Sequence, residues 1–162
     1  MRKSLFFLVG LSLLLLISLP ITTADAVLEF TIPERVEIAL STSVVDLGAP
    51  RGSRQLSYEQ INAVRVDYRC NIPSEWEVRI SATDFSNVDR TIPITRLKWR
   101  ADRGPYREMP PSGSYAVLAR KRDYNKGSGL KHTKTISYRL DLSGDERGGT
   151  YTAPITYTLF VP

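Results

Sequence analysis

Apolar and polar residues alternate along most of the chain, and the clearest alternation lies in its last stretch, residues 148–162. A period of two places every second side chain on one face of a β-strand. The residue types agree, because β-branched and aromatic side chains fit a pleated, half-buried surface. Gly148 and Gly149 indicate a turn before it. We predict a final strand whose core-facing residues are Tyr151, Ala153, Ile155, Tyr157, Leu159 and Val161.

The same alternation predicts further strands upstream. Residues 27–40 are predicted to form two short strands, or one strand bent at Pro33. The others are predicted at residues 44–48, 64–70, 76–82, 92–99, 115–117 and 136–142. Residues 58–62 are predicted to form a brief helical turn or an irregular segment that leads into the strand at 64–70. No stretch after residue 26 keeps a helical period, so roughly eight or nine short strands indicate an all-β, antiparallel, two-sheet β-sandwich of the Ig-like type.

Turn signals predict how some of these strands are joined. Residues 71–74, with Pro73, predict a hairpin between strands 64–70 and 76–82. Residues 143–149 predict a hairpin loop into the final strand. Residues 84–90, 101–113 and 120–131 are predicted as loops, the second because its Gly and Pro residues break a helix.

The N-terminus has the parts of a secretory signal peptide. Arg2 and Lys3 precede an apolar run from Leu5 to Leu19, and Ala24-Asp25-Ala26 is a small-x-small cleavage site. We therefore expect residues 1–26 to be removed and residues 27–162 to form a single secreted domain. An uncleaved anchor is the alternative, because the run is close to the shortest membrane span. The expected location is the cell surface or envelope, or the periplasm if the organism has an outer membrane.

The cysteine content and the charge distribution give limited information about disulfides and binding partners. Cys70 is the only cysteine, so no disulfide forms within the chain, and a buried thiol is favoured over pairing between chains. The formal net charge is +5, and basic residues concentrate in residues 96–107 and 120–134. An exported protein is not expected to meet nucleic acid. An anionic wall polymer or a membrane surface is a more plausible partner for the basic residues. The alternative is that these residues bind no partner and form a solvated surface that aids solubility.

The sequence indicates no catalytic device, cofactor or metal centre. His132 is the only histidine, so a Ser-His-Asp or Cys-His arrangement would depend on that one residue. Asp84, Asp89 and Asp102 lie in predicted loops but lack the dense spacing of a calcium loop. Aromatic and basic residues in or near loops are the candidate contacts for a wall polymer or other ligand: Trp76, Trp99, Arg100, Tyr106, Lys121 and Tyr157.

Two stretches resemble the WxL domain of bacterial cell-surface proteins. Trp76-Glu77-Val78, followed by residues 79–85, is similar to the first Trp-x-Leu motif, with Val in place of Leu. Residues 149–159 are similar to the second, with Tyr157 in place of Trp. The framework also resembles the spore-coat-U type of secreted, pilin-like subunit, without its cysteine pattern. The WxL resemblance implies non-covalent attachment to peptidoglycan and no catalysis.

We therefore expect a secreted, non-catalytic surface domain that binds cell-wall polysaccharide, peptidoglycan or a partner surface protein. The alternative is a structural fibre subunit, a homo-oligomer assembled by exchange of the strand at residues 28–40. A secreted hydrolase is disfavoured for want of a nucleophile motif.

Overall fold

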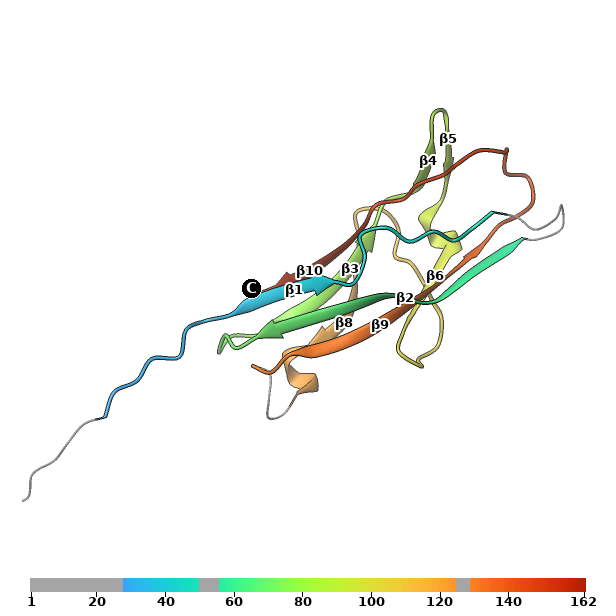
Figure 1. The fold of residues 1–162 in the computed structure, drawn as a ribbon. Helices are drawn as coiled ribbons and strands as arrows, with labels where there is room; N and C mark the ends of the chain where they lie inside the picture. The colour runs from blue at the N-terminus through green and yellow to red at the C-terminus, as the bar shows by residue number, and fades with distance from the viewer. Residues whose placement is uncertain (1–27, 50–55, 125–128) are drawn as a thin grey trace, which may run out of the picture. The chain divides into compact units, whose positions relative to one another are not determined.

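The computed structural model describes residues 28–49, 56–124 and 129–162, and it is all-β with antiparallel strands (Figure 1). The predicted signal peptide therefore lies outside the described residues. The chain divides into two compact units after Ile32, and the compact unit discussed below is Pro33–Pro162, which holds all the described strands. The described parts contain no helix long and apolar enough to cross a membrane.

Ten strands and two 3-10 helices make up the described fold. In chain order they are β1 (Val36–Leu40), β2 (Ser57–Cys70), β3 (Glu77–Ala82), β4 (Phe85–Asn87), β5 (Arg90–Ile92), η1 (Ile94–Arg96), β6 (Leu97–Ala101), β7 (Arg107–Glu108), β8 (Ala116–Arg120), η2 (Lys121–Asp123), β9 (His132–Asp141) and β10 (Ile155–Phe160).

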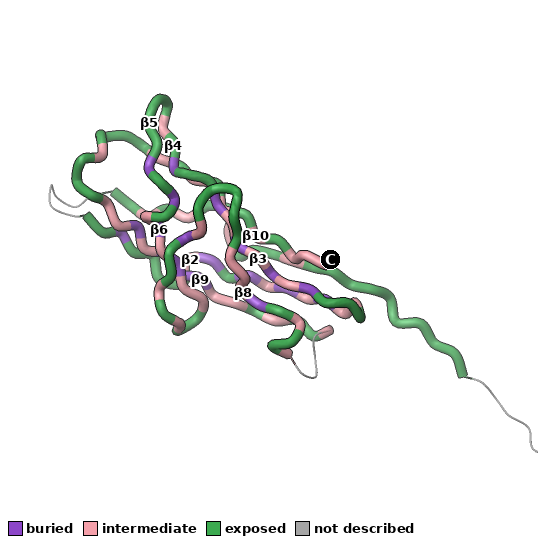
Figure 2. Tube along the Cα trace, turned by 180° about the vertical axis from the view of Figure 1, so that it is seen from behind, coloured by how far each residue is buried: buried purple, intermediate pink, exposed green. Residues whose placement is uncertain are grey.

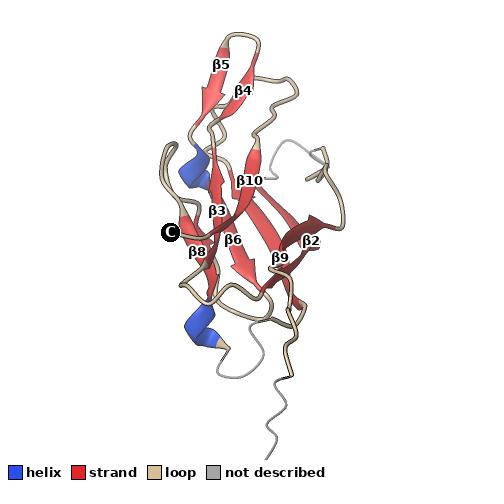
Figure 3. Ribbon diagram, turned by 90° about the vertical axis from the view of Figure 1, so that its left-hand side faces the viewer, coloured by secondary structure: helices blue, strands red, loops and turns tan. Residues whose placement is uncertain are grey.

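The strands form a five-stranded sheet, a three-stranded sheet and a small hairpin (Figure 3). The five-stranded sheet has the order β1-β2-β9-β6-β7, and the three-stranded sheet has the order β10-β3-β8. The hairpin consists of β4 and β5. Strands β1 and β10 are therefore edge strands of their sheets, although they come from opposite ends of the compact unit.

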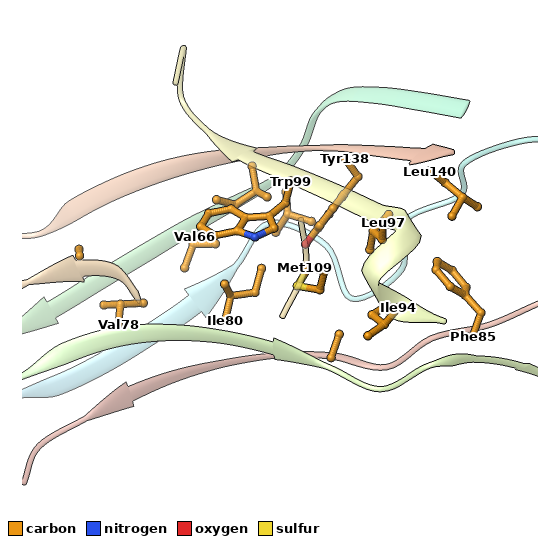
Figure 4. Packing of buried hydrophobic residues seen from close by; sticks show 14 of the residues in the cluster. Val66, Val78, Ile80, Phe85, Ile94, Leu97, Trp99, Met109, Tyr138 and Leu140 are labelled. Atoms are coloured by element: carbon orange, nitrogen blue, oxygen red, sulfur yellow. The ribbon is translucent and has the colours of Figure 1, made fainter. Parts of the chain in front are cut away.

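Both larger sheets send side chains into one hydrophobic core (Figures 2 and 4). Val66 from β2 and Ile136 from β9 are fully buried on one side, and Val78 and Ile80 from β3 are fully buried on the other. Apart from Ser137, which is also buried, their neighbours in sequence are less buried, as strand geometry requires. Cys70 lies in this core as a free thiol, which confirms the expectation of a buried cysteine.

The alternation in the last stretch is confirmed. In β10, Ile155, Tyr157 and Leu159 are partly buried against the core, whereas Thr156 and Thr158 are exposed. The carbonyl oxygen of Pro154 accepts a 3.2 Å hydrogen bond from the N–H of Thr83, where the chain enters this pairing.

Both predicted hairpins are wrong. Strand β2 pairs with β1 and β9, whereas β3 pairs with β10 and β8, so residues 71–76 cross from one sheet to the other. Residues 142–154 likewise lead from β9 in the five-stranded sheet to β10 in the three-stranded sheet. Alternation determines which side chains face the core, but it does not determine which strand lies alongside.

Residues 58–62 belong to β2 and are not helical, which corrects the prediction for that stretch. A bulge between Gln60 and Val64 interrupts the pairing with β9. The apolar and polar residues therefore do not alternate regularly through this stretch, and the sequence did not indicate a strand. Asn62 adopts a positive φ of 54° there, and its backbone N–H donates a 3.0 Å hydrogen bond to Ser137 Oγ.

Other stretches also differ from their predictions. Of the two short strands predicted at residues 27–40, only the second forms, as β1, and residues 28–35 are not in a strand. The predicted loops at 101–113 and 120–131 contain β7 and η2. Residues 44–48 form no strand, although Val45 and Leu47 pack against the core. The predicted loop at 84–90 contains β4 and the start of β5. The predicted strand at 92–99 begins with β5 and η1 and becomes β6 only at Leu97.

The loop after β9 is organised around the carboxylate of Glu146. Its oxygens accept hydrogen bonds from the backbone N–H groups of Ser143 (2.9 Å) and Gly144 (2.8 Å), and it pairs with the Arg96 guanidinium. Gly144 has a φ of 93°, which favours glycine at this position. Burial alone would raise the pKa of Glu146, but these hydrogen bonds outweigh it and lower the pKa to about 2.

Truncating a core side chain of β3 should destabilise the compact unit. Ile80 is fully buried, so Ile80→Ala removes buried methyl groups and leaves a cavity. We expect the free energy of unfolding to fall by about 2–5 kcal/mol. Urea denaturation measures this, with Thr156→Ala as the control, because Thr156 lies exposed on the adjacent strand. Equal midpoints for the two variants would contradict the assignment of Ile80 to the core.

Stability should also depend on the ionisation of Glu146. A lowered folded-state pKa means that the ionised form stabilises the fold above the ordinary pKa of 4.5, and that this contribution disappears as the pH falls toward about 2. In Glu146→Gln, that part of the pH dependence should be missing. Urea midpoints measured from pH 2 to pH 7 test this, with Glu108→Gln on β7 as the control. Parallel profiles for wild type and Glu146→Gln would exclude this role.

Candidate functional site

The structure brings two of the six predicted contact residues together and separates the others. Trp76 and Trp99 are 2% and 3% exposed and lie in the core. Trp99 is seen among Val66, Ile80 and Tyr138 in Figure 4. Tyr157 also faces inward, and its hydroxyl forms a hydrogen bond with that of Tyr138. These three aromatic side chains therefore contribute packing to the described fold.

Lys121 lies apart from the other candidates, at the start of η2. Its ammonium group donates hydrogen bonds to the backbone carbonyl oxygens of Pro73 and Ser74, the latter at 3.2 Å. This links η2 to the loop between β2 and β3. The Lys121 side chain is thus engaged in holding two chain segments together.

Arg100 and Tyr106 meet on the outer face of the five-stranded sheet, where Arg139 joins them. The Cζ atom of Arg100 lies 4.7 Å from the centroid of the Tyr106 ring, and that of Arg139 lies 4.9 Å from it. Both distances fall within the range of cation–π attraction. The Tyr106 hydroxyl donates a hydrogen bond to the carboxylate of Glu59 on β2. We call Glu59, Arg100, Tyr106 and Arg139 the basic–aromatic cluster.

Sheet register explains why the two arginines are neighbours. Strands β6 and β9 pair so that Lys98 lies opposite Arg139 and Arg100 lies opposite Ser137. Because Trp99 and Tyr138 point into the core, Lys98, Arg100 and Arg139 point outward. The cross-strand diagonal then brings both guanidinium groups within reach of one aromatic ring.

The loop that carries Tyr106 is held in place by Asp102. Asp102 has a positive φ of 53°, a conformation that aspartate tolerates in turns. Its carboxylate accepts hydrogen bonds of 3.0 Å from the N–H of Thr135 and 2.9 Å from Lys134 Nζ. Burial opposes ionisation, but these two bonds lower the pKa of Asp102. The loop is therefore tied to β9.

Charges on this face are unequally satisfied. Lys98 lies 2.8 Å from a carboxylate oxygen of Asp141, and Arg139 lies 3.4 Å from the other. Arg100 has no ion-pair partner in the part of the chain that the structure describes, and its Nε–H is buried without an acceptor there. The Nε–H of Arg139 is also buried without an acceptor. The half-buried Arg100 is consequently distinguished by having no carboxylate partner in the described ranges, whereas Arg139 pairs with Asp141.

Tyr106 itself remains a neutral hydroxyl at ordinary pH. Partial burial raises its pKa, and the hydrogen bond to Glu59 adds to the effect, while Arg100 and Arg139 oppose it. The cluster therefore holds two guanidinium groups within cation–π distance of one aromatic ring, whose hydroxyl is bonded to a carboxylate. Such an arrangement can contact a sugar ring through its aromatic side chain and donate hydrogen bonds to an anionic group through its guanidinium groups.

Sequence reasoning missed Glu59 and Arg139. Arg139 had a usable signal, because it alternates with the apolar residues of the predicted strand at 136–142 and so had to face outward. Glu59 had none, since its stretch was not predicted to be a strand.

The remaining chemistry-bearing residues serve the fold. His132 stacks on Tyr124 with ring centroids 3.8 Å apart. Asp84 accepts hydrogen bonds from the N–H of Ile94 (2.9 Å) and from Ser112 Oγ (3.2 Å). In the described ranges, no three His, Cys, Asp or Glu side chains are arranged to hold a metal ion.

No protein-family model matches this chain, and no curated protein matches its sequence. The WxL and spore-coat-U resemblances accordingly rest on the quoted motifs alone, and the function must be argued from the geometry of the site.

Proposed function

We propose that this chain is an exported, non-catalytic envelope domain with an Ig-like β-sandwich fold that binds an anionic cell-wall polymer through the basic–aromatic cluster. The observation that carries the proposal is the Arg100 guanidinium. It is stacked on Tyr106 and lacks a carboxylate partner among the described residues. Retaining such a cation on a structured face is expected where an external anion completes its hydrogen bonds.

The surrounding charges favour a polymer over a small ligand. Lys98 flanks the cluster on the same sheet face, in an ion pair with Asp141. A flat face with an aromatic ring and spaced cations matches a repeating chain of sugars and acidic groups better than it matches a compact molecule, which prefers a concave site. Binding would be largely electrostatic and would weaken as salt screens the charges.

The N-terminal sequence supports the location in this proposal. Residues 1–26 have the composition of a secretory leader, and a wall polymer is met only after export. The resemblance to WxL domains points to the same non-covalent attachment. Its Trp76, however, is buried, so the wall contact proposed here uses a different surface from that motif.

Removing the two stacked cations should weaken binding to cell walls. Arg100→Gln and Arg139→Gln each delete a guanidinium from the cluster, and we expect each to lower the affinity for isolated sacculi by about 2- to 5-fold. Sedimentation of the exported chain with sacculi, over a series of salt concentrations, measures the affinity. The wild-type affinity should fall steadily as salt rises.

Arg90→Gln and Arg122→Gln are matched controls, because each removes one exposed arginine from an element, β5 or η2, that contributes no residue to the cluster. If these controls reduce binding as much as the cluster variants, the attraction is a general effect of net charge and the assigned site is wrong. Tyr106→Ala adds a second check, since it removes the stacking surface without changing the charge.

A further inference from the structure

The edges of the two sheets that carry β1 and β10 leave the core incompletely covered. These strands run close together in Figure 1, but no ladder of hydrogen bonds joins them. Strand β1 bonds only to β2, and β10 bonds only to β3. The gap between them is an open seam along one side of the core, and we call it the β1–β10 seam.

Burial along this seam differs from burial at the centre of the sheets. Val36 and Leu40 of β1 are 46% and 43% exposed, whereas Val66 of the neighbouring β2 is fully buried. On the other side, Ile155 and Tyr157 are only partly buried, whereas Ile80 of the neighbouring β3 is fully buried. The core-facing side chains of β1 and of β10 are therefore both partly exposed to solvent along the seam.

A groove of about 360 Å³ lies at this edge. Its walls come from the chain after β1 and from the start of β10, and its floor includes Tyr138 and Leu97 from the core. The lining is mainly apolar, and it includes Val44, Val45, Ala153 and Ile155. An apolar groove beside a strand with one unpaired edge is a site where an extended segment can add to a sheet.

The backbone of β10 offers the matching hydrogen-bonding groups. The bond from Thr83 N–H to Pro154 O shows that Pro154 directs its carbonyl toward β3. In an antiparallel ladder, successive residues direct their backbone groups to opposite sides. The N–H and C=O groups of Ile155, Tyr157 and Leu159 therefore face the free edge.

Leu28–Ile32 has the pattern that such an edge requires. Leu28, Phe30 and Ile32 are 95%, 82% and 70% exposed, and they alternate with Glu29 and Thr31. In an extended backbone, the three apolar side chains share one face. Three large apolar side chains exposed in succession are a liability for an exported protein unless a partner covers them.

We propose that Leu28–Ile32 of one copy adds as a strand to the free edge of β10 in a second copy, with Leu28, Phe30 and Ile32 in the groove of the β1–β10 seam. This locates the strand exchange that the sequence suggested at 28–40. Residues 36–40 cannot be donated without breaking β1, because they already pair with β2.

Such a contact joins two different surfaces, so its repetition extends a row of copies rather than closing a symmetric pair. The proposal is independent of polymer binding, because the basic–aromatic cluster lies on the outer face of the other sheet. Loss of assembly and loss of wall binding can therefore be observed separately.

Sedimentation velocity of the exported chain over a range of concentrations tests this assembly. The wild type should form concentration-dependent species larger than a monomer. Phe30→Asp places a charge in the groove and should weaken association by at least about tenfold. Thr31→Asp is the matched control, since it adds the same charge on the opposite face and should associate like the wild type. Circular dichroism confirms that each variant is folded.

Disulfide trapping identifies the acceptor. A Phe30→Cys chain mixed with an Ala153→Cys chain of different mass should give a mixed disulfide, whereas Thr31→Cys should not, and buried Cys70 does not compete. A wild type that stays monomeric at every concentration would overturn the proposal. So would assembly by Phe30→Asp equal to that of Thr31→Asp, or a disulfide that forms only within a single Phe30→Cys, Ala153→Cys chain.

Discussion

The antiparallel pairing of β2 with β9 is the constraint on which the rest of the described structure depends. It joins the two longest strands, from Ser57 opposite Asp141 to Tyr68 opposite His132. One face of this ladder supplies Val64, Val66, Ile136 and Tyr138 to the core. The other face carries Glu59 and Arg139 into the basic–aromatic cluster. A shift of one residue would exchange the two faces and lose both core and cluster.

The bulge within this ladder allows β2 to pair with β9 on both sides of a point where β2 has extra residues. It takes up the extra residues between Gln60 and Val64, and Ser137 Oγ satisfies the backbone N–H of Asn62 where the regular pairing is lost. Ser137 is itself fully buried, so a larger or apolar side chain there would leave a donor without a partner. The irregularity is thus a specified part of the fold.

Alternation in the sequence predicted the all-β class and the core-facing rows. These properties are local, because they depend only on the period of two within each strand. The pairing of strands is not local. Nothing within residues 71–76 or 142–154 shows that the chain changes sheets there, so both predicted hairpins failed. The cluster was half predicted for the same reason. Arg100 and Tyr106 lie close in sequence, whereas Glu59 and Arg139 reach the ring only through β2 and β9.

The single, fully buried Cys70 has a consequence for how the protein matures. A fold completed by packing alone requires no oxidant, isomerase or thiol exchange, so its maturation should not vary with the redox state of the compartment. The same thiol is shielded from reagents in the native state and exposed when the core opens. Its rate of alkylation would report, at a single atom, how often the two sheets separate.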